Sequence, residues 1–406
     1  MKLLLVAPTA DPGAVGESWL AFQWVSRLSE RHEVTVLSYY QRAKQPLAGA
    51  LPKARVVEWR EPPLVGRHER FSAMLNPGYV PFCWKARRWI RKAVASGERF
   101  HIGHQVAPVS LRYESPLART GVPYVVGPVG GSLSSPPDFA REEGGAPWFT
   151  NLRKLDQLRL RWDPILRTSF RSAECVVGIA DYVEELLEDV GVRDFRTLSD
   201  VGVDTMPPAA LGSDRKEHVR FLFVGRIVRT KGVRDAIRAL YLIPRGIGVL
   251  DVVGEGYDRA GCEVLASELG IRDLVRFHGR VPHDQVDAFY DAADVFLFPS
   301  YREAGGIVVV EAMAHGLPVI VCDAGGPATT VDDASGLKVP AINPHQYAGA
   351  LAEAMRELAR DPARRLAMGR AGRSRTAAKG LWDSRIRWIE ELYEEILARQ
   401  HSGYPK

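Results

Sequence analysis

Residues 295–321 constrain the fold of this chain more than any other stretch. An apolar run at 295–298 predicts a buried strand, two glycines at 305–306 predict a turn, and Glu311 lies in a helix-forming run. A strand, a glycine turn and a helix in this order present free backbone N–H groups to an anion. A second apolar run at 318–321 supplies the next strand. The segment therefore predicts a parallel α/β unit that binds an anionic ligand.

Two glutamates frame this turn. Glu303 lies in the loop before the expected helix, and Glu311 lies about one turn inside it, on the same side as Ile307. Carboxylates bind sugar hydroxyls and helix N-termini bind diphosphates, so the pair fits a nucleotide-sugar site. Two glutamates eight positions apart also occur by chance in most chains, and the pair alone does not define a site.

Strand and helix patterns alternate along the whole chain, which is typical of doubly wound parallel sheets. The strands expected in the first half are 3–7, 33–38, 101–107, 123–126 and 175–179. The helices expected there are 18–29, 81–96, 152–170 and 182–189. The strands expected in the second half are 219–224, 247–253, 275–278, 295–298 and 318–321. Ligands of such sheets bind at the carboxyl ends of the strands.

Length and composition agree with a two-domain globular protein. The 406 residues fit two domains of roughly 200 residues each. Four scattered cysteines without a CxxC pair argue for a reducing compartment and against a disulfide framework or a zinc site. The first apolar run is short and ends at Pro8, so it is typical of a buried strand and not of a signal peptide. No run approaches the ~20 apolar residues of a spanning helix. We expect a cytoplasmic protein.

Two cations follow the strand expected at 219–224. Arg226 comes directly after Gly225, and Lys231 precedes Gly232. Both follow the carboxyl end of one strand and can converge on a single phosphate group. Two solvated cations in a polar loop are the alternative.

These motifs together resemble retaining glycosyltransferases of family 4, the E-x7-E group with the GT-B fold. The resemblance covers residues 299–340 and extends to the G-R-x4-K-G pattern that begins at Gly225. It implies an α/β protein of two Rossmann-like, doubly wound parallel-sheet domains facing a central cleft. The expected division is an acceptor-binding domain at 1–205, a linker at 206–218, a donor-binding domain at 219–385, and a C-terminal helix at 386–406 that packs on the N-terminal domain.

The resemblance also implies roles for these residues. Arg226 and Lys231 would hold the donor diphosphate and stabilise the charge that grows on it as it leaves. No DxD motif stands in the expected place, so no metal is expected. Glu311 would accept hydrogen bonds from the ribose hydroxyls, and Glu303 would align the sugar. The other donor contacts implied are Gly225, Gly254, Arg280, Val281, Gly305, Gly306 and Ile307.

The first half of the chain is less regular. Gly16 and Glu17 open a helix and resemble the loop that covers the diphosphate in the family; a simple turn is the alternative. Residues 127–132 contain a GPVGG loop at the position where many members of the family have a histidine. The loop resembles that of a subgroup of the family. Its backbone N–H groups, including that of Gly130, could replace the side-chain donor. His104 is the nearest histidine, and it is either a catalytic residue or a structural one.

Basic residues interleave with aromatic ones at 67–99 and 153–171. Such helices can lie on anionic membranes, where each basic residue adds about 1 kcal/mol. They could equally recognise a phosphorylated or lipid-linked acceptor, or form a solvated face with the aromatic residues packed inward. A net charge of only +5 and the lack of a binding motif argue against nucleic acid.

The resemblance therefore implies a retaining, metal-independent glycosyltransferase of the hexosyltransferase type. It would move a sugar from a UDP- or GDP-linked donor to the hydroxyl of a sugar, a lipid-linked acceptor or a small molecule, and would need no other cofactor. Polysaccharide, glycolipid and secondary-metabolite glycoside synthesis fit equally. Its location would be cytoplasmic, with peripheral contact to the inner face of the membrane. A GT-B nucleotide-sugar epimerase and a non-catalytic nucleotide-sugar-binding protein are the alternatives.

Overall fold

The computed structural model describes residues 1–14, 16–40, 46–60, 78–143, 154–208 and 218–401. The chain forms two compact units. Unit 1 consists of Met1–Ser132, Pro147–Asp200 and Ile386–Lys406, and unit 2 consists of Leu133–Ala146 and Val201–Arg385. The expected N-terminal domain, 1–205, included residues 133–143, which the structure places in unit 2, where the Phe139 side chain is buried. Most of the expected linker lies outside the described residues.

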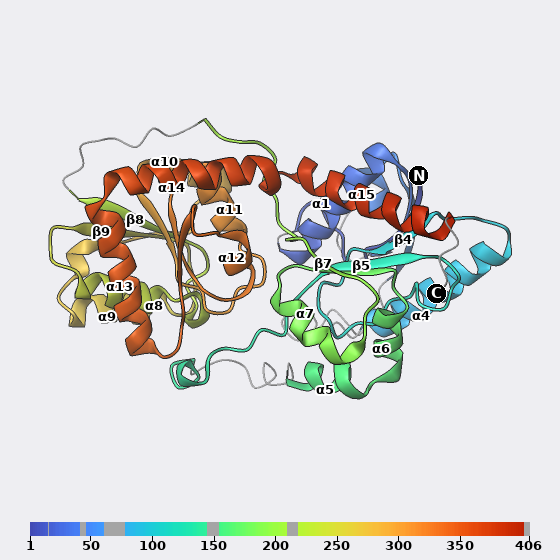
Figure 1. The fold of residues 1–406 in the computed structure, drawn as a ribbon, viewed down its shortest axis with the longest axis horizontal. Helices are drawn as coiled ribbons and strands as arrows, with labels where there is room; N and C mark the ends of the chain where they lie inside the picture. The colour runs from blue at the N-terminus through green and yellow to red at the C-terminus, as the bar shows by residue number, and fades with distance from the viewer. Residues whose placement is uncertain (15, 41–45, 61–77, 144–153, 209–217, 402–406) are drawn as a thin grey trace. The chain divides into compact units, whose positions relative to one another are not determined.

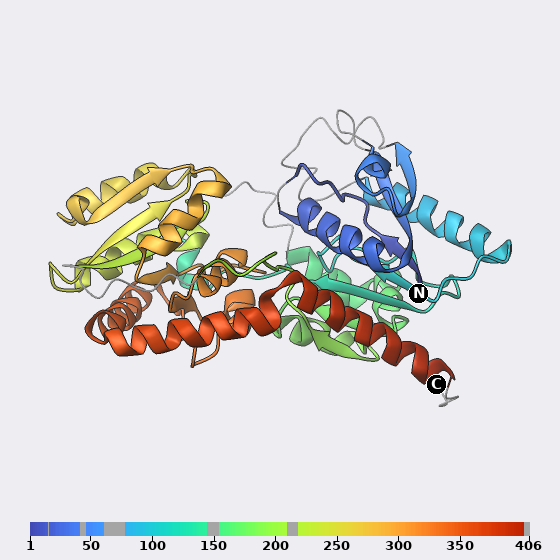
Figure 2. The ribbon, with the colours of Figure 1, turned by 90° about the horizontal axis from the view of Figure 1, so that it is seen from above.

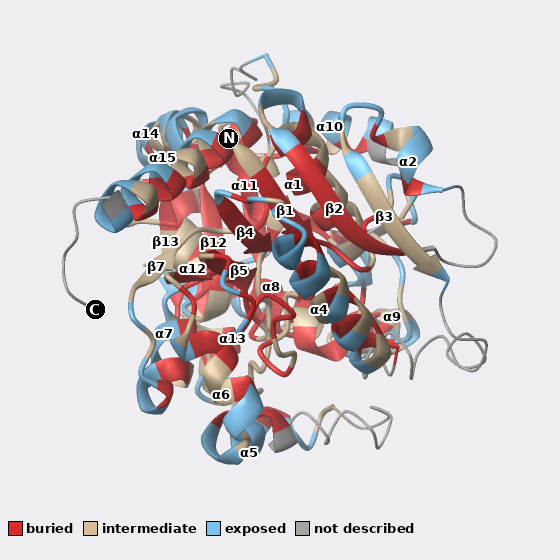
Figure 3. Ribbon diagram, turned by 90° about the vertical axis from the view of Figure 1, so that its right-hand side faces the viewer, coloured by how far each residue is buried: buried red, intermediate tan, exposed pale blue. Residues whose placement is uncertain are grey.

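Unit 1 is built on a parallel sheet of seven strands in the order β3-β2-β1-β4-β5-β6-β7. Its strands are β1 (Lys2–Val6), β2 (Glu33–Tyr40), β3 (Arg55–Arg60), β4 (Ile102–Gln105), β5 (Tyr124–Val129), β6 (Cys175–Gly178) and β7 (Phe195–Thr197). The central strands are apolar along their whole length because both faces of the sheet are covered. Figure 3 shows β1, β4 and β5 as buried and the edge strand β3 as only half-buried.

Helices of unit 1 bury apolar side chains at helical spacing, as in Glu17–Arg31 and Tyr79–Ala95. They are α1 (Glu17–Arg31), α2 (Leu47–Ala50), α4 (Tyr79–Ala95), α5 (Lys154–Trp162), α6 (Pro164–Arg171), α7 (Tyr182–Leu187), the 3-10 turn η4 (Glu188–Val190) and most of α15 (Trp382–His401). The helix expected at 152–170 is two helices, because the Asp163 side chain caps the second and Pro164 occupies its first position. Figure 2 shows α4, in cyan, on the outside of unit 1.

Unit 2 is built on a parallel sheet of six strands in the order β10-β9-β8-β11-β12-β13. Its strands are β8 (Val219–Val224), β9 (Gly248–Val253), β10 (Val275–Gly279), β11 (Val295–Phe298), β12 (Val319–Cys322) and β13 (Gly336–Val339). Its helices are α8 (Val233–Leu242), α9 (Arg259–Glu268), α10 (His283–Ala292), α11 (Ile307–Ala314), α12 (Gly325–Thr330), α13 (Pro344–Arg360) and α14 (Pro362–Arg375). Shorter turns are η2 (Pro137–Phe139), η5 (Arg229–Lys231), η6 (Arg272–Leu274) and the π-helical η7 (Thr376–Gly380).

The helices of unit 2 form two layers around this sheet. In Figure 1, α8, α9 and α13 lie along one face, and α10, α11 and α14 lie along the other. The predicted architecture of two parallel, doubly wound α/β sheets is therefore confirmed. Among the described residues, no helix is both long and apolar enough to cross a membrane.

Candidate functional site

The sheet of unit 2 has one point at which the strand order reverses. From β8 the chain moves outward to β9 and β10, and then returns to β11, which pairs with the other side of β8. The loops that leave β8 and β11 therefore diverge in opposite directions at the carboxyl edge of the sheet. In open α/β sheets this crevice is where ligands bind. We call it the unit 2 switch point.

An ion pair crosses the unit 2 switch point. Lys231, which follows β8, bonds through Nζ to Glu303 Oε2, which follows β11. The two side chains are only 15% and 17% exposed, and Lys231 Nζ lies 5.2 Å from the centroid of the Phe298 ring. Burial, together with the positive charges of Arg226 and Arg302, lowers the pKa of Lys231 to about 7. Arg226 and Arg302 thus add positive charge around the Lys231–Glu303 pair, which favours an added anion.

Arg226 supplies the second predicted cation of this crevice. Its side chain is exposed directly beyond β8, and no ion pair joins it to another described residue. Its charge nevertheless reaches Lys231, as the lowered pKa of that residue records. An anion placed between Arg226 and Lys231 would receive charge-assisted hydrogen bonds from both.

Gly232 fixes the Lys231 turn against the loop that leaves β11. Its backbone is left-handed, with φ at 75°, and a Cβ there would lie 2.0 Å from the carbonyl oxygen of Pro299. Only glycine permits this approach, so the K-G pair of the sequence motif is a packing requirement as well as a cation position.

The first turn of α11 forms the other wall of the crevice. Gly306 precedes this helix in a left-handed conformation, and Ile307 is its first residue. Glu311 lies one turn further on and accepts a 2.8 Å hydrogen bond from the Tyr290 hydroxyl. Burial, reinforced by the charge of Glu311, raises the pKa of Tyr290 far above its ordinary value, so the hydroxyl stays a donor and fixes the carboxylate.

The remaining predicted residues of unit 2 lie at the same edge of the sheet. Gly225 and Gly254 end the adjacent strands β8 and β9, and Gly254 N–H donates to Gly279 O at 2.8 Å. Arg280 and Val281 follow β10, with Arg280 exposed. The structure therefore brings together the carboxyl ends of β8, β9, β10 and β11. The site residues predicted for the second half of the chain follow these ends or lie in α11.

The sheet of unit 1 also reverses its order, between β1 and β4. Gly16, with φ at 69°, precedes α1 in the loop that follows β1, and no atom of the described residues lies within 4 Å of a Cβ placed on it. The next residue, Glu17, accepts a 2.8 Å hydrogen bond from the Val109 N–H beyond β4. A carboxylate therefore bridges the two diverging loops of this sheet.

Gly130 does not have the free N–H group that the sequence analysis assigned to it. Its N–H donates to Val109 O at 2.8 Å, and a Cβ would lie 2.0 Å from Ile179 Cδ1. The neighbouring Gly131 N–H donates to the Tyr182 hydroxyl at 3.0 Å. Gly130 is buried because β5 continues into the GPVGG segment, so its glycine serves packing. The expectation that its N–H binds the donor is corrected.

His104 is an internal residue of β4. It is fully buried, its Nε2 donates to Gly127 O at 2.6 Å, and its Nδ1 is bonded to the Tyr393 hydroxyl. Burial lowers the pKa of His104 to about 4, so the ring is neutral at ordinary pH. Both ring nitrogens are occupied within unit 1. This corrects the prediction of a catalytic His104 in favour of the structural alternative.

The basic helices only partly follow the interpretation of a solvated face with aromatics packed inward. On α4, Tyr79 and Phe82 are buried, but Trp84 is 62% exposed. On α5, Trp162 is 72% exposed. Arg67, Arg70 and Arg153 of the expected surfaces lie outside the described residues.

Arg302 is a charged residue of this crevice that the sequence analysis did not identify. It immediately precedes Glu303, and its charge contributes to the lowered pKa of Lys231. Its position beside a predicted site glutamate was the available signal. The four cysteines are buried and unpaired, and no cluster of metal-binding side chains occurs in the part of the chain that the structure describes.

Comparison with known proteins agrees with this geometry. Residues 212–375, which contain the whole sheet of unit 2, match the family model described as Glycosyl transferases group 1. This part of the chain is therefore similar to glycosyl transferases group 1. D-inositol 3-phosphate glycosyltransferase from Corynebacterium kroppenstedtii is 36% identical over 187 residues, covering 44% of this chain and 40% of that protein. The corresponding protein from Thermomonospora curvata is 37% identical over 197 residues, covering 45% and 44%. The chain thus matches less than half the length of these curated relatives.

Solved structures match over nearly the whole chain. Sucrose-phosphate synthase from Thermosynechococcus elongatus covers 98% of this chain and 99% of its own, with a TM-score of 0.67 at 22% identity. HepE from Anabaena in complex with UDP covers 97% and 100%, with a TM-score of 0.65 at 17% identity. At these identities the likeness shows the fold, and it confirms the GT-B class expected from the sequence.

Proposed function

We propose that this protein is a retaining glycosyltransferase that moves a sugar from a nucleoside diphosphate to an acceptor hydroxyl. The observation that carries the proposal is the Lys231–Glu303 pair across the unit 2 switch point, with Arg226 beside it. The family match of residues 212–375 supports the reaction class. Structures of the same fold contain UDP and UDP-glucose, which supports a nucleotide-sugar donor and makes UDP the first nucleotide to test.

Each residue of the crevice has a role in this reaction. Arg226 and Lys231 bind the diphosphate and stabilise the negative charge that grows on it as the glycosidic bond breaks. The first-turn N–H groups of α11 add to this stabilisation. Glu303, held by Lys231, orients the sugar and stabilises the positive charge that develops on its ring. Glu311, held by Tyr290, accepts hydrogen bonds from the ribose hydroxyls.

Retention follows from attack on the same face that the diphosphate leaves. The bond between the sugar and the diphosphate breaks first and leaves a short-lived ion pair. The acceptor oxygen then forms the new glycosidic bond on the same face, and the departed diphosphate takes the proton of the acceptor hydroxyl. No side-chain nucleophile is required, and the two cations provide the charge stabilisation without a metal ion. Arg280 and Val281 edge the nucleotide base.

A nucleotide-sugar epimerase would need the same donor crevice. It would process the donor without an acceptor and would need acid and base groups in the crevice beyond Glu303. A non-catalytic binding protein would bind the nucleotide sugar without forming any free nucleoside diphosphate from it. Measuring free nucleoside diphosphate with and without acceptor separates the three, because only a transferase releases it in proportion to acceptor consumed.

A thermal-shift screen tests the donor class. The full chain is titrated without metal against UDP, GDP, ADP and dTDP and their sugar conjugates, because a ligand that binds the native state raises the melting temperature. We expect one nucleotide series to stabilise the wild type and not Arg226→Ala or Glu311→Ala. Arg245→Ala, at an exposed arginine of unit 2 outside the crevice, is the matched control. Equal stabilisation of all four proteins would contradict the proposed site.

The acceptor side of the proposal includes contact with an anionic membrane through unit 1. Trp84 is exposed on α4, and Arg88 stacks 5.6 Å from its ring centroid. Trp162 is exposed with Arg161 at 5.4 Å in the same way. Exposed tryptophan beside arginine suits a lipid headgroup region, where each basic residue adds about 1 kcal/mol.

Sedimentation with vesicles tests this contact. We expect the protein to bind vesicles of phosphatidylglycerol and phosphatidylcholine, to leave them as salt rises, and to bind more weakly as Trp84→Ala. Equal binding to purely zwitterionic vesicles would contradict the dependence on anionic lipid. Binding to neither kind would contradict membrane contact and leave a solvated face.

A further inference from the structure

Residues 133–143 form a segment that we call the strap. In sequence it lies between β5 and α5, both of which belong to unit 1, yet the strap packs within unit 2. Its 3-10 turn, Pro137–Phe139, carries Phe139, whose side chain is 0% exposed in the hydrophobic core of unit 2. The Phe139 ring centroid lies 4.4 Å from that of Tyr301 and 6.0 Å from that of Tyr347. The strap is therefore anchored beside the loop that leaves β11.

The strap also holds the loop that leaves β8. Arg229 is 1% exposed, and its guanidinium carbon lies 5.4 Å from the ring centroids of both Phe139 and Tyr301. It forms ion pairs with Asp235 at 2.6 Å and with Glu142 of the strap at 2.7 Å. A buried guanidinium must keep its carboxylate partners, because an unpaired buried charge is strongly destabilising. Since Arg229 begins the short turn that Lys231 ends, Glu142 and Phe139 act on the position of Lys231.

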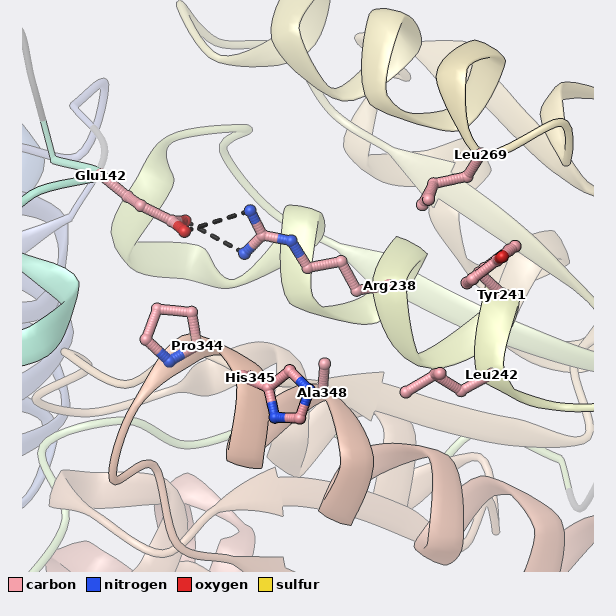
Figure 4. A pocket seen from close by; sticks show the side chains of 8 residues that line it. All are labelled: Glu142, Arg238, Tyr241, Leu242, Leu269, Pro344, His345 and Ala348. Carbon is pink, nitrogen blue, oxygen red and sulfur yellow. Dashed lines mark hydrogen bonds and ion pairs between the residues drawn. The ribbon is translucent and has the colours of Figure 1, made fainter.

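Glu142 makes a second anchor on the same side of unit 2. Its two carboxylate oxygens receive hydrogen bonds from Arg238 of α8 at 3.0 and 3.1 Å. Figure 4 shows this paired contact at the edge of a hollow that Pro344 and His345 also line. The carboxylate therefore joins α8 to the turn that contains Arg229.

The strap reaches the loop of Glu303 by a third contact. Arg302 Nη1 donates to Ser135 Oγ at 3.1 Å and to Glu143 Oε2 at 3.4 Å. Arg302 is the residue before Glu303, and Tyr301, which packs on Phe139, is the residue before that. The strap thus contacts both loops of the unit 2 switch point, which are Arg229–Lys231 after β8 and 301–303 after β11.

We propose that the strap is a positioning segment of the donor site. It sets the separation of Lys231 and Glu303, and so prepares the crevice for the diphosphate and the transferred sugar. Its residues touch neither ligand; they act through Arg229, Tyr301 and Arg302. This inference rests on the proposed function, since it assigns a supporting role at the same site.

The alternative is that the strap only stabilises unit 2. The two roles differ in what they do to ligand recognition. The strap holds the loops that face the diphosphate, while Glu311 and Arg280, which would meet the ribose and the base, are outside its contacts. If the strap positions these loops, changing it should reduce the difference in affinity between a nucleoside diphosphate and the monophosphate. If the strap only stabilises unit 2, this difference should stay the same.

Calorimetric titration of the full chain with UDP and with UMP tests the strap. Glu142→Gln and Glu143→Gln remove one carboxylate each, and Phe139→Leu removes the aromatic anchor. We expect these variants to bind UDP about tenfold more weakly and UMP nearly as the wild type does. Glu357→Gln is the control, because Glu357 pairs with Arg364 on a distant helix of unit 2.

Three results bear on the inference. A smaller preference for UDP over UMP in the strap variants, with native near-ultraviolet circular dichroism, supports it. Unchanged affinity for both nucleotides in folded strap variants overturns it and leaves the proposed function intact. If the wild type binds none of UDP, GDP, ADP and dTDP, the proposed function fails and the strap inference fails with it. Should Phe139→Leu not fold, the two glutamine variants decide.

Discussion

The two sheets of this protein reverse their strand order in the same way and equip the resulting crevices differently. In unit 2, β8 and β11 diverge around Lys231 and Glu303, where Arg226 adds positive charge. In unit 1, β1 and β4 diverge around Glu17, whose carboxylate already bonds to Val109 N–H. One crevice is prepared for an anion, and the other is bridged by its own side chain.

This difference shows what the fold decides and what the side chains decide. Topology alone places a crevice in each sheet. Only charge distinguishes them, since a diphosphate needs donors that the protein has not already satisfied. Under the proposed function, the comparison favours unit 2 as the donor site and leaves unit 1 for an acceptor that is not bound through a strong phosphate site at its switch point.

The largest effect is expected from the cations of unit 2. Lys231→Ala and Arg226→Ala should each lower kcat/KM by about 10²–10³, because each removes a donor aimed at charge that develops in the transition state. Steady-state release of the nucleoside diphosphate measures this. Arg196→Ala, in a surface ion pair of unit 1, is the control and should keep its activity. If Lys231→Ala kept the activity of the wild type, the difference drawn between the two crevices would be wrong where it predicts the largest effect.

His104 should matter for stability and not for donor binding. His104→Ala leaves the Gly127 carbonyl and the Tyr393 hydroxyl without their buried partner, which should cost about 2–4 kcal/mol of unfolding free energy. Denaturant unfolding measures it, with UDP affinity as the second readout. A variant of native stability that loses transfer activity would restore the catalytic role that the structure removes.

His104 should also contribute to acid sensitivity. Its folded-state pKa of about 4 lies below the unfolded value of 6.5. The unfolded chain therefore takes up a proton first, and stability falls as pH drops from 6.5 towards 4, by roughly 3 kcal/mol. Unfolding curves of wild type and His104→Gln over this range should differ in slope. Identical slopes would mean that the buried histidine does not stay neutral.

Nucleotide binding should take up a proton at Lys231. Its pKa is about 7 in the empty crevice, and a bound diphosphate favours the charged amine and raises the pKa. Affinity should then be constant below pH 7 and fall above it, by up to about tenfold per pH unit. Calorimetric titrations at pH 8 in phosphate and in Tris measure this proton uptake. The two buffers have different ionisation enthalpies, so the observed binding enthalpy should differ between them. No difference, or affinity that rises with pH, would contradict the assignment.

The smallest effect is expected from Tyr290. Tyr290→Phe removes the hydroxyl that holds Glu311 and should weaken UDP binding by a few-fold, corresponding to about 0.5–1.5 kcal/mol. Binding of a 2′-deoxy nucleotide should be less affected, because the hydroxyl it lacks is one that Glu311 contacts. An equal loss of affinity for both nucleotides would show that Tyr290 does not act through ribose recognition.

The sequence predicted the parts of unit 2 in which local pattern and buried structure coincide. The strands expected at 219–224 and 295–298 have these bounds in the structure, because each contains a run of four buried apolar residues. The strands β3, β7 and β13 were missed. They carry half-buried or exposed positions and are short or lie at sheet edges, where the apolar pattern is weak.

The errors in the candidate site have a common physical cause. Gly130 and His104 were taken as ligand-facing from their place beyond or within a strand, but their bonds to Val109 and Tyr393 depend on segments distant in sequence. The strap was unpredictable for the same reason. Phe139 packs on Tyr301, which is 162 positions away in the sequence, and Glu142 bonds to Arg229, which is 87 positions away. No local pattern in 133–143 indicates such partners.

Photolabelling tests the central claim, that the donor binds in the unit 2 crevice, most directly. The full chain is irradiated with an azido-base analogue of the nucleotide that stabilises it, and the labelled peptide is identified by mass spectrometry. The account predicts saturable labelling near residues 279–281, where β10 ends, that unlabelled nucleotide suppresses and that Lys231→Ala abolishes. Saturable labelling confined to the loops of unit 1 around Gly16 or Gly130 would contradict it.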